Sequence, residues 1–292
     1  MNRNSKAVTV TQRPIESPFD VRDGRVMLSL GPLSKRKFCT YSCPFCYVGD
    51  DFHSYASMPP LEIAKWVAAL RDPFDIIYVS YDTDSFAPPR VHTALELLDL
   101  LSAFNVDLLF TTRAVLSEAS LAHLERIAKR LATSNRMLIG CVSVLQLTVP
   151  HLEPRPIPPP DARIAQLGRL RAAGLKTVLA LRPFLPNVPL TDLREIVARA
   201  APNIDLVLGG VWYYDQRGRI VSDVMGSEGA KLVPDDTRRM PFDDNKAEWH
   251  VFEGAEAQAT VSEVCRSYGI PMFMRSGPGV AWLRSASSGL LR

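Results

Sequence analysis

The sequence has little cysteine, almost no net charge and no long apolar run. Its 292 residues include 5 Cys, and 34 Lys and Arg nearly balance 31 Asp and Glu, which gives a formal net charge of +3. So few cysteines exclude a disulfide scaffold, and the balanced charge provides no strong basic field for nucleic acid. No run approaches the roughly 18 apolar residues of a membrane span, and the polar residues 1–14 lack the apolar core of a secretory signal. These absences predict a soluble, cytoplasmic protein that does not contact membranes.

Apolar runs typical of β-strands alternate with amphipathic segments typical of helices. The runs begin at Val26, Asp75, Val106, Met137, Thr177 and Asp205. Several are apolar almost throughout, as expected of strands covered on both faces, and the later ones recur at the spacing of a βα unit. Such units in series predict an α/β fold with a parallel sheet, either doubly wound or curled into a barrel. A last helix is expected over residues 256–268.

No change in composition divides the chain, so we expect one domain with three parts. These are an N-terminal extension over residues 1–24, a core over 25–215 and a C-terminal capping segment over 216–292. The stretches 150–160 and 216–250 are rich in proline or in polar residues, and both are expected to be long loops.

Three cysteines directly after the first predicted strand are the strongest local feature. Cys39, Cys43 and Cys46 have the spacing CxxxCxxC. Closely spaced thiolates bind iron–sulfur clusters or zinc. Structural zinc normally takes four protein ligands, whereas the other cysteines lie on a predicted strand and a predicted helix. The loop therefore favours a cluster with one iron that has no protein ligand, and His53 as a fourth ligand keeps zinc as the alternative.

This motif, with the aromatic Phe45 before its last cysteine, resembles the signature of the radical S-adenosylmethionine (SAM) superfamily. The resemblance implies a 4Fe–4S cluster held by Cys39, Cys43 and Cys46, whose open iron chelates the amino and carboxylate groups of SAM. One electron then cleaves SAM to methionine and a 5′-deoxyadenosyl radical, which abstracts a hydrogen atom from a substrate. The implied fold is a partial (β/α)6 barrel, in agreement with the strand–helix alternation.

A narrower resemblance, to spore photoproduct lyase-like proteins, covers the middle of the chain. It rests on the segments 81–90, 110–113 and 151–175, which read YDTDSFAPPR, FTTR and HLEPRPIPPPDARIAQLGRLRAAGL. Three features depart from that branch. The usual Gly-Gly-Glu stretch is absent, Arg113 stands where lysine is common, and no cysteine lies between Cys46 and Cys141, where the lyase has its hydrogen donor. These departures favour a substrate other than damaged DNA.

Polar side chains at the ends of the predicted strands are candidates for binding SAM, because ligands of parallel α/β folds bind there. The candidates for binding the ammonium group are Asp82, Thr83 and Asp84, and their alternative role is to cap the next helix. The candidates for binding the ribose hydroxyls are Ser143 and Gln146. The alternative for Ser143 is a small buried residue that only fills space. Arg113 suits the SAM carboxylate because a guanidinium binds carboxylates through two parallel hydrogen bonds.

Other residues are candidates for contact with the substrate or with an electron donor. Cys141 lies two residues before Ser143 on the same face of its strand, and is either a hydrogen-atom donor or an inert core residue. The aromatic candidates for stacking on a substrate, or for packing at the barrel edge, are Trp212, Tyr213 and Tyr214. Arg275 begins a Gly-Pro turn suited to an anion. The basic run 35–37 would attract a phosphorylated substrate or a flavodoxin- or ferredoxin-like donor.

Together these features predict a radical SAM enzyme that acts on a small substrate, such as a nucleoside, nucleotide or sugar, in a biosynthetic pathway. Residues 216–250 and 275–292 are expected to cap the barrel mouth over that substrate. Two alternatives remain open at this point. One is a DNA-lesion lyase, which would need a basic face and a base-flipping wedge. The other is an iron–sulfur or zinc protein whose metal does no chemistry.

Overall fold

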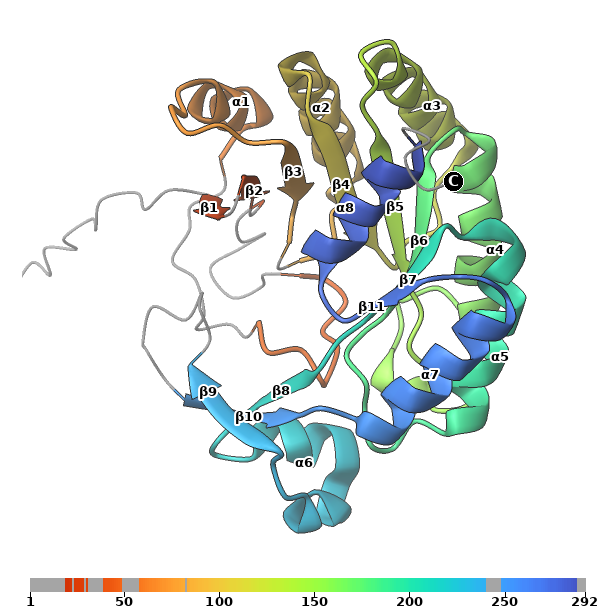
Figure 1. Ribbon diagram of the computed structural model, residues 1–292. Helices are drawn as coiled ribbons and strands as arrows, with labels where there is room; N and C mark the ends of the chain where they lie inside the picture. Colours follow the sequence, from red (N-terminus) through yellow and green to blue (C-terminus); the bar gives the residue numbers. More distant parts are fainter. Residues whose placement is uncertain are drawn as a thin grey trace, which may run out of the picture.

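A curled sheet forms the centre of the molecule (Figure 1). The computed structural model describes residues 19–22, 24–28, 30, 39–48, 58–81, 83–239 and 248–287. The sheet has eight strands in the order β1 (Phe19–Arg22), β2 (Arg25–Leu28), β3 (Ile76–Val79), β4 (Asp107–Thr112), β5 (Leu138–Ser143), β6 (Lys176–Leu181), β7 (Leu206–Gly209) and β11 (Met272–Phe273). All neighbours pair in parallel except β1, which is antiparallel to β2. This arrangement confirms the predicted α/β fold and its partial-barrel form.

Helices cover the outer face of the sheet, as the amphipathic segments predict. They are α1 (Pro60–Ala68), α2 (Val91–Leu101), α3 (Glu118–Ala132), α4 (Pro160–Ala172), α5 (Leu190–Ala200) and α7 (Ala255–Ser267). Their apolar stripes bury residues such as Leu98 and Leu124 against outward strand residues such as Ile77 and Leu108. Short 3-10 helices follow as η1 (Ser102–Phe104), η2 (Pro150–Leu152) and η3 (Ala201–Asn203). Within the described residues, no helix is long and apolar enough to cross a membrane.

The C-terminal helix α8 (Ser276–Ser287) lies on the inner face of the sheet. Its residues Val280 and Leu283 pack against the inward side chains Ile76, Leu109, Ile139, Val178 and Leu206. Near its end, Arg284 forms ion pairs with Asp107 at 2.5 Å and with Asp75 at 3.5 Å, at the amino ends of β4 and β3. Helix α8 therefore buries the apolar lower half of the barrel interior, and a capping role for residues 275–292 stays a prediction.

The strand expected from Asp205 to Tyr214 is wrong as one element, since it forms two strands in two sheets. The first, β7, ends at Gly209, and β8 (Trp212–Asp215) joins a second sheet in the order β8–β10–β9, with β10 (Glu248–Phe252) and β9 (Asp236–Arg239). Gly210 stands at the break, where an added Cβ would lie 2.9 Å from the Cβ of Arg182. Only glycine lets the backbone pass this close.

The long loop expected over 216–250 is also wrong in its described part. This segment forms α6 (Arg219–Met225), η4 (Gly226–Lys231) and strands β9 and β10, while residues 240–247 lie outside the described residues. Helix α6 begins under the carboxylate of Asp215, which accepts a hydrogen bond from the backbone N–H of Ile220 at 2.8 Å. The other expected loop, 150–160, is confirmed apart from the single turn of η2.

Candidate active site

The three-cysteine loop follows β2 and lies at the carboxyl-end side of the sheet. Cys39, Cys43 and Cys46 are half-buried free thiols, and the N–H of Cys46 donates to the carbonyl of Cys43 at 3.0 Å in a tight turn. Burial raises the pKa of the Cys43 thiol to about 11 and that of Cys46 to about 12, and the nearby positive charge of Arg113 opposes both shifts. These thiols therefore need a positively charged partner to be held as thiolates at neutral pH.

The described residues do not form a site for a single metal ion. Among the described residues, no three His, Cys, Asp or Glu side chains gather as they would around one ion. In a 4Fe–4S cluster each cysteine binds a different iron, so the thiols need not converge on one point, whereas structural zinc draws four ligands to one centre. His53, the alternative fourth ligand for zinc, lies outside the described residues.

Phe45 connects this loop to the barrel and to the second sheet. Its side chain is buried, and its carbonyl accepts a hydrogen bond from the indole N–H of Trp212 at 3.2 Å. The guanidinium carbon of Arg113 lies 5.5 Å from the centre of the Phe45 ring, within the range of a cation–π contact. Phe45 therefore brings the cysteine loop and the end of β4 together.

The three aromatic candidates for substrate stacking divide into two groups. Trp212 and Tyr214 are buried and pack together with their ring centres 5.0 Å apart, so they fit the alternative of packing at the barrel edge. Tyr213 points the other way and meets Tyr47, the residue after the last loop cysteine, edge to face at 6.3 Å. Tyr213 alone stays a candidate for the substrate.

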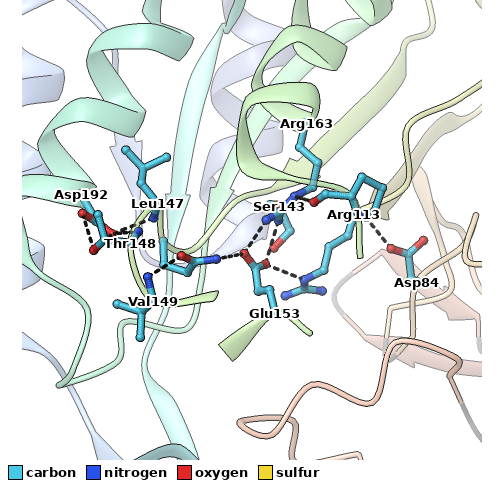
Figure 2. A network of polar contacts seen from close by, with 11 residues as sticks. Asp84, Arg113, Ser143, Leu147, Thr148, Val149, Glu153, Arg163 and Asp192 are labelled. Atoms are coloured by element: carbon cyan, nitrogen blue, oxygen red, sulfur yellow. Dashed lines mark hydrogen bonds and ion pairs between the residues drawn. The ribbon is translucent and has the colours of Figure 1, made fainter. Parts of the chain in front are cut away.

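A buried network of arginines and carboxylates joins the strand ends (Figure 2). Glu153 accepts hydrogen bonds from Arg163 at 2.5 and 2.8 Å and from Nε of Arg113 at 3.2 Å. The side chains of Glu153 and Arg163 are 1% and 0% exposed. Arg163 also donates to the carbonyl of Ser143 at 2.5 Å. The network fixes the ends of β4 and β5 and the loop before α4 relative to one another.

Arg113 keeps its terminal nitrogens available. Only its Nε and its backbone N–H are bonded within the described residues, to Glu153 and to Asp84. Burial disfavours its charge, but Cys43, Glu153 and Asp84 outweigh that effect and raise the pKa of Arg113. A permanently charged guanidinium fork therefore lies beside the cysteine loop, in a position to bind a carboxylate.

The polar residues after β3 have partners within the protein. Asp84 is buried, and its carboxylate accepts from Thr112 Oγ1 at 2.8 Å and from the backbone N–H groups of Phe86 at 2.8 Å and Arg113 at 2.5 Å. Burial raises the pKa of Asp84, and these hydrogen bonds oppose the shift. Thr83 bonds to Ser80 and, at 3.4 Å, to Arg90. Asp84 thus joins β3 to β4, while Asp82 lies outside the described residues.

Ser143 and Gln146, the candidates for the ribose, differ in what they offer. Ser143 is 2% exposed, and its Oγ has no hydrogen-bond partner among the described residues. A buried hydroxyl of this kind is satisfied when a ligand donates or accepts there. Gln146 instead uses both polar atoms within the protein, since its Oε1 accepts from the N–H of Val149 at 2.8 Å and its Nε2 donates to Glu153 at 3.4 Å. Only Ser143 offers an unsatisfied group to SAM.

Two further candidates lie deeper in the barrel or at its lip. Cys141 is fully buried on the inner face of β5, where burial raises the pKa of its thiol to about 11. Arg275 is exposed and immediately precedes α8. The basic run 35–37 lies outside the described residues.

Sequence reasoning missed the roles of Glu153, Arg163 and Asp192. The carboxylate of Asp192 accepts from the backbone N–H groups of Leu147 at 2.7 Å and Thr148 at 2.8 Å, which holds the loop after β5 against α5 (Figure 2). Glu153 and Arg163 stand in the resembling segment 151–175, but this segment also contains Arg155, Asp161, Arg169 and Arg171, so no signal in the sequence singled out the buried pair.

Comparisons with known proteins agree with this geometry. Residues 34–200 match the family model described as the Radical SAM superfamily. An uncharacterized protein, ORF301, of Acidianus two-tailed virus is 25% identical over 177 residues; the match covers 54% of this chain and 57% of the viral protein. The chain thus spans less than two thirds of that relative.

Solved structures of spore photoproduct lyase share the fold. One mutant superposes with a TM-score of 0.58 at 12% identity, over 80% of this chain and 73% of the lyase. Another mutant, solved with bound AdoMet and dinucleoside spore photoproduct, gives a TM-score of 0.57 at 14% identity over the same 80% and 73%. At this identity the likeness shows the fold and nothing of the substrate.

The family model spans more than half of the chain, including the cysteine loop, the strand ends and the buried network. Enzymes of this family use a 4Fe–4S cluster and SAM, the two cofactors that the cysteine motif implied. The chain belongs to the radical SAM superfamily.

Proposed function

We propose that this enzyme binds its cluster through Cys39, Cys43 and Cys46 and uses it to act on a small substrate. The observation that carries the proposal is the juxtaposition of this loop with the free guanidinium fork of Arg113 and the unpartnered hydroxyl of Ser143. When bound, the reduced cluster and SAM together supply a 5′-deoxyadenosyl radical that removes a hydrogen atom from the substrate.

The residues around the loop would hold SAM in one orientation. The terminal nitrogens of Arg113 suit its carboxylate, and the buried Oγ of Ser143 suits a ribose hydroxyl. Glu153 and Asp84 act on Arg113 from two sides, through its Nε and its backbone N–H. They are positioning residues, because Glu153 fixes where the guanidinium points and Asp84 holds the backbone of Arg113, while the outer edge of the guanidinium stays free.

A small substrate fits the interior that α8 leaves uncovered better than a duplex does. Helix α8 fills the lower half of the barrel, with Gly279 so close to Leu208 that an added Cβ would lie 3.2 Å from it. The remaining inward positions lie near the carboxyl ends of the strands. A substrate held there, such as a nucleoside, nucleotide or sugar, would be shielded from water while a radical is present. The biosynthetic role and the flavodoxin- or ferredoxin-like electron donor are part of the same proposal.

Cys141 is the proposed hydrogen-atom donor to a substrate radical. Donation requires the protonated thiol, and burial keeps this thiol protonated at neutral pH by raising its pKa to about 11. Its position on the inner face of β5, two residues below Ser143, places it beneath the proposed SAM site.

The test is cleavage of SAM by the anaerobically reconstituted, reduced protein. We expect about four irons per chain by the cluster chemistry of this motif, and 5′-deoxyadenosine formed in reductant-dependent amounts. Replacing Cys39, Cys43 and Cys46 together by alanine abolishes both, whereas Cys265→Ala, a buried cysteine on α7 outside the site, leaves both intact.

The result that contradicts the proposal is a colourless protein with one zinc per chain and no SAM cleavage. The substrate class is tested separately, by adding double-stranded DNA with and without a dipyrimidine lesion. Tight, steeply salt-dependent binding together with repair of the lesion would replace the small substrate by DNA.

A further inference from the structure

The inner face of the sheet changes from apolar to polar along the strands. Side chains alternate between the two faces of a strand, so the inward residues are every second one. Near the amino ends they are apolar and covered by α8. Further along the strands the inward residues are polar, namely Thr111, Ser143 and Arg182, while Tyr78 and Cys141 belong to the part that α8 covers.

Arg182 brings an uncompensated positive charge into this interior. It follows β6 two residues after Ala180 and four after Val178, so the alternation of the strand directs it inward. Its side chain passes close to the backbone of Gly210, where a Cβ added to Gly210 would lie 2.9 Å from the Cβ of Arg182. The side chain is half-buried and makes no hydrogen bond or ion pair with the described residues. A guanidinium that is partly removed from water and has no partner is destabilised, so a ligand that supplies a partner is favoured.

Tyr78 offers a donor on the opposite wall. Its side chain is 3% exposed, and its hydroxyl has no hydrogen-bond partner of ordinary geometry among the described residues. Burial raises the pKa of Tyr78, and so does the Cys141 thiol. Contact with Ser276 at the start of α8 and the positive charges of Arg25 and Arg182 oppose this shift. The positive charge of Arg182 therefore favours an anion beside the Tyr78 hydroxyl.

The first turn of α8 points into the same space. Gly277 lies so close to Arg25 that an added Cβ would be 2.9 Å from its Nη1. The amino end of a helix has unpaired N–H groups and a partial positive charge. Helix α8 has 12 residues and its first residue faces Tyr78, so its amino end adds to the positive field inside the barrel.

We propose that Arg182 and Tyr78, with the first turn of α8, bind an acidic group of the substrate, a carboxylate or a phosphate. The inference rests on the proposed function, because it assigns the substrate's anchor in the same barrel. The acidic group lies between Arg182 and Tyr78, and the rest of the substrate extends towards Ser143 and Arg113. Anchoring one end fixes which hydrogen faces the radical, which an indiscriminate radical requires.

The experiment measures anion binding to the oxidised, cluster-loaded, SAM-saturated enzyme by calorimetry at low ionic strength. The probes are inorganic phosphate and acetate in separate titrations, and the stronger of the two names the acidic group. Arg182→Gln should weaken binding of the tighter-binding probe about tenfold or more, which is the range for losing a hydrogen bond to a charged group. Tyr78→Phe should weaken binding of this probe severalfold with little loss of resistance to urea, because the hydroxyl has no hydrogen bond of ordinary geometry to lose.

The matched control is Arg136→Gln. Arg136 is also half-buried and without a partner among the described residues, but it lines a cavity of about 450 Å³ at the other end of the sheet, beside Asp107. This variant should bind the probe like the unmodified enzyme. SAM affinity should be unchanged in all three variants.

Two results overturn the inference. One is that neither probe binds, or that Arg182→Gln and Arg136→Gln affect binding equally. The other is that Arg182→Gln weakens binding of SAM and leaves binding of the probe unchanged, which would make Arg182 part of the cofactor site. Anion binding is measured on the oxidised protein and does not require SAM cleavage. The anion site and the proposed radical SAM activity are therefore tested separately.

Discussion

Neutralising Glu153 should destabilise the protein strongly, because the charge of Arg163 would then stand buried without compensation. The two side chains are 1% and 0% exposed and 2.5 Å apart. Glu153→Gln keeps the volume of the side chain and removes only its charge. Breaking a buried pair in this way costs about 3–5 kcal/mol, a large part of the roughly 5–15 kcal/mol that stabilises a typical domain. Urea unfolding followed by circular dichroism measures the loss.

The chain contains a matched control for this change. Glu118 pairs with Arg169 at 2.6 Å, but its side chain is 86% exposed. Glu118→Gln should therefore cost about 0–1 kcal/mol, as exposed pairs do. If the two variants lose equal free energy of unfolding, burial does not set the strength of the Glu153 pair and the reasoning is refuted.

Three further outcomes are expected. Arg113→Ala should weaken SAM binding about tenfold to a hundredfold, the range for a hydrogen bond to a charged group, while Arg136→Ala leaves it unchanged; equal affinity in both variants would remove Arg113 from the site. Cys141→Ala should abolish transfer of hydrogen from the thiol to the substrate radical, so that a reaction in deuterated water no longer places deuterium in the product. Cys265→Ala should leave this deuterium in the product; burial raises the pKa of both thiols to about 11, so the two variants are matched. Deleting residues 276–292 should give an insoluble protein, because the deletion uncovers the inward residues beneath Val280 and Leu283; a soluble, cluster-loaded truncation would contradict this packing.

Local patterns were enough to predict the family and the main chain path. The spacing of Cys39, Cys43 and Cys46 is a property of eight residues, and a cluster ligated in one loop needs nothing further from the fold to be recognised. Parallel strands buried on both faces are apolar throughout, so β3 to β6 were predictable from composition alone. The amphipathic helices on the outer face followed from their spacing in the same way.

Contacts between distant segments decided the rest. Asp84 and Gln146 carry the right groups for SAM, yet their oxygens and nitrogens are taken by Thr112, Arg113, Val149 and Glu153, and only the folded chain shows this. The break at Gly210 depends on Arg182, 28 positions earlier in the numbering, whose Cβ leaves no room for a side chain.

The sequence alone therefore determined that the chain has βα units in series and a three-cysteine loop, because those signals are periodic or contiguous, and the family resemblance of the loop implied the partial barrel. Only the tertiary structure decided that α8 lies inside the barrel, since an amphipathic helix has the same pattern whichever apolar surface it covers. It also decided which polar groups stay unsatisfied, because that depends on partners supplied by other strands. The free edge of Arg113, the hydroxyls of Ser143 and Tyr78 and the charge of Arg182 are of this kind.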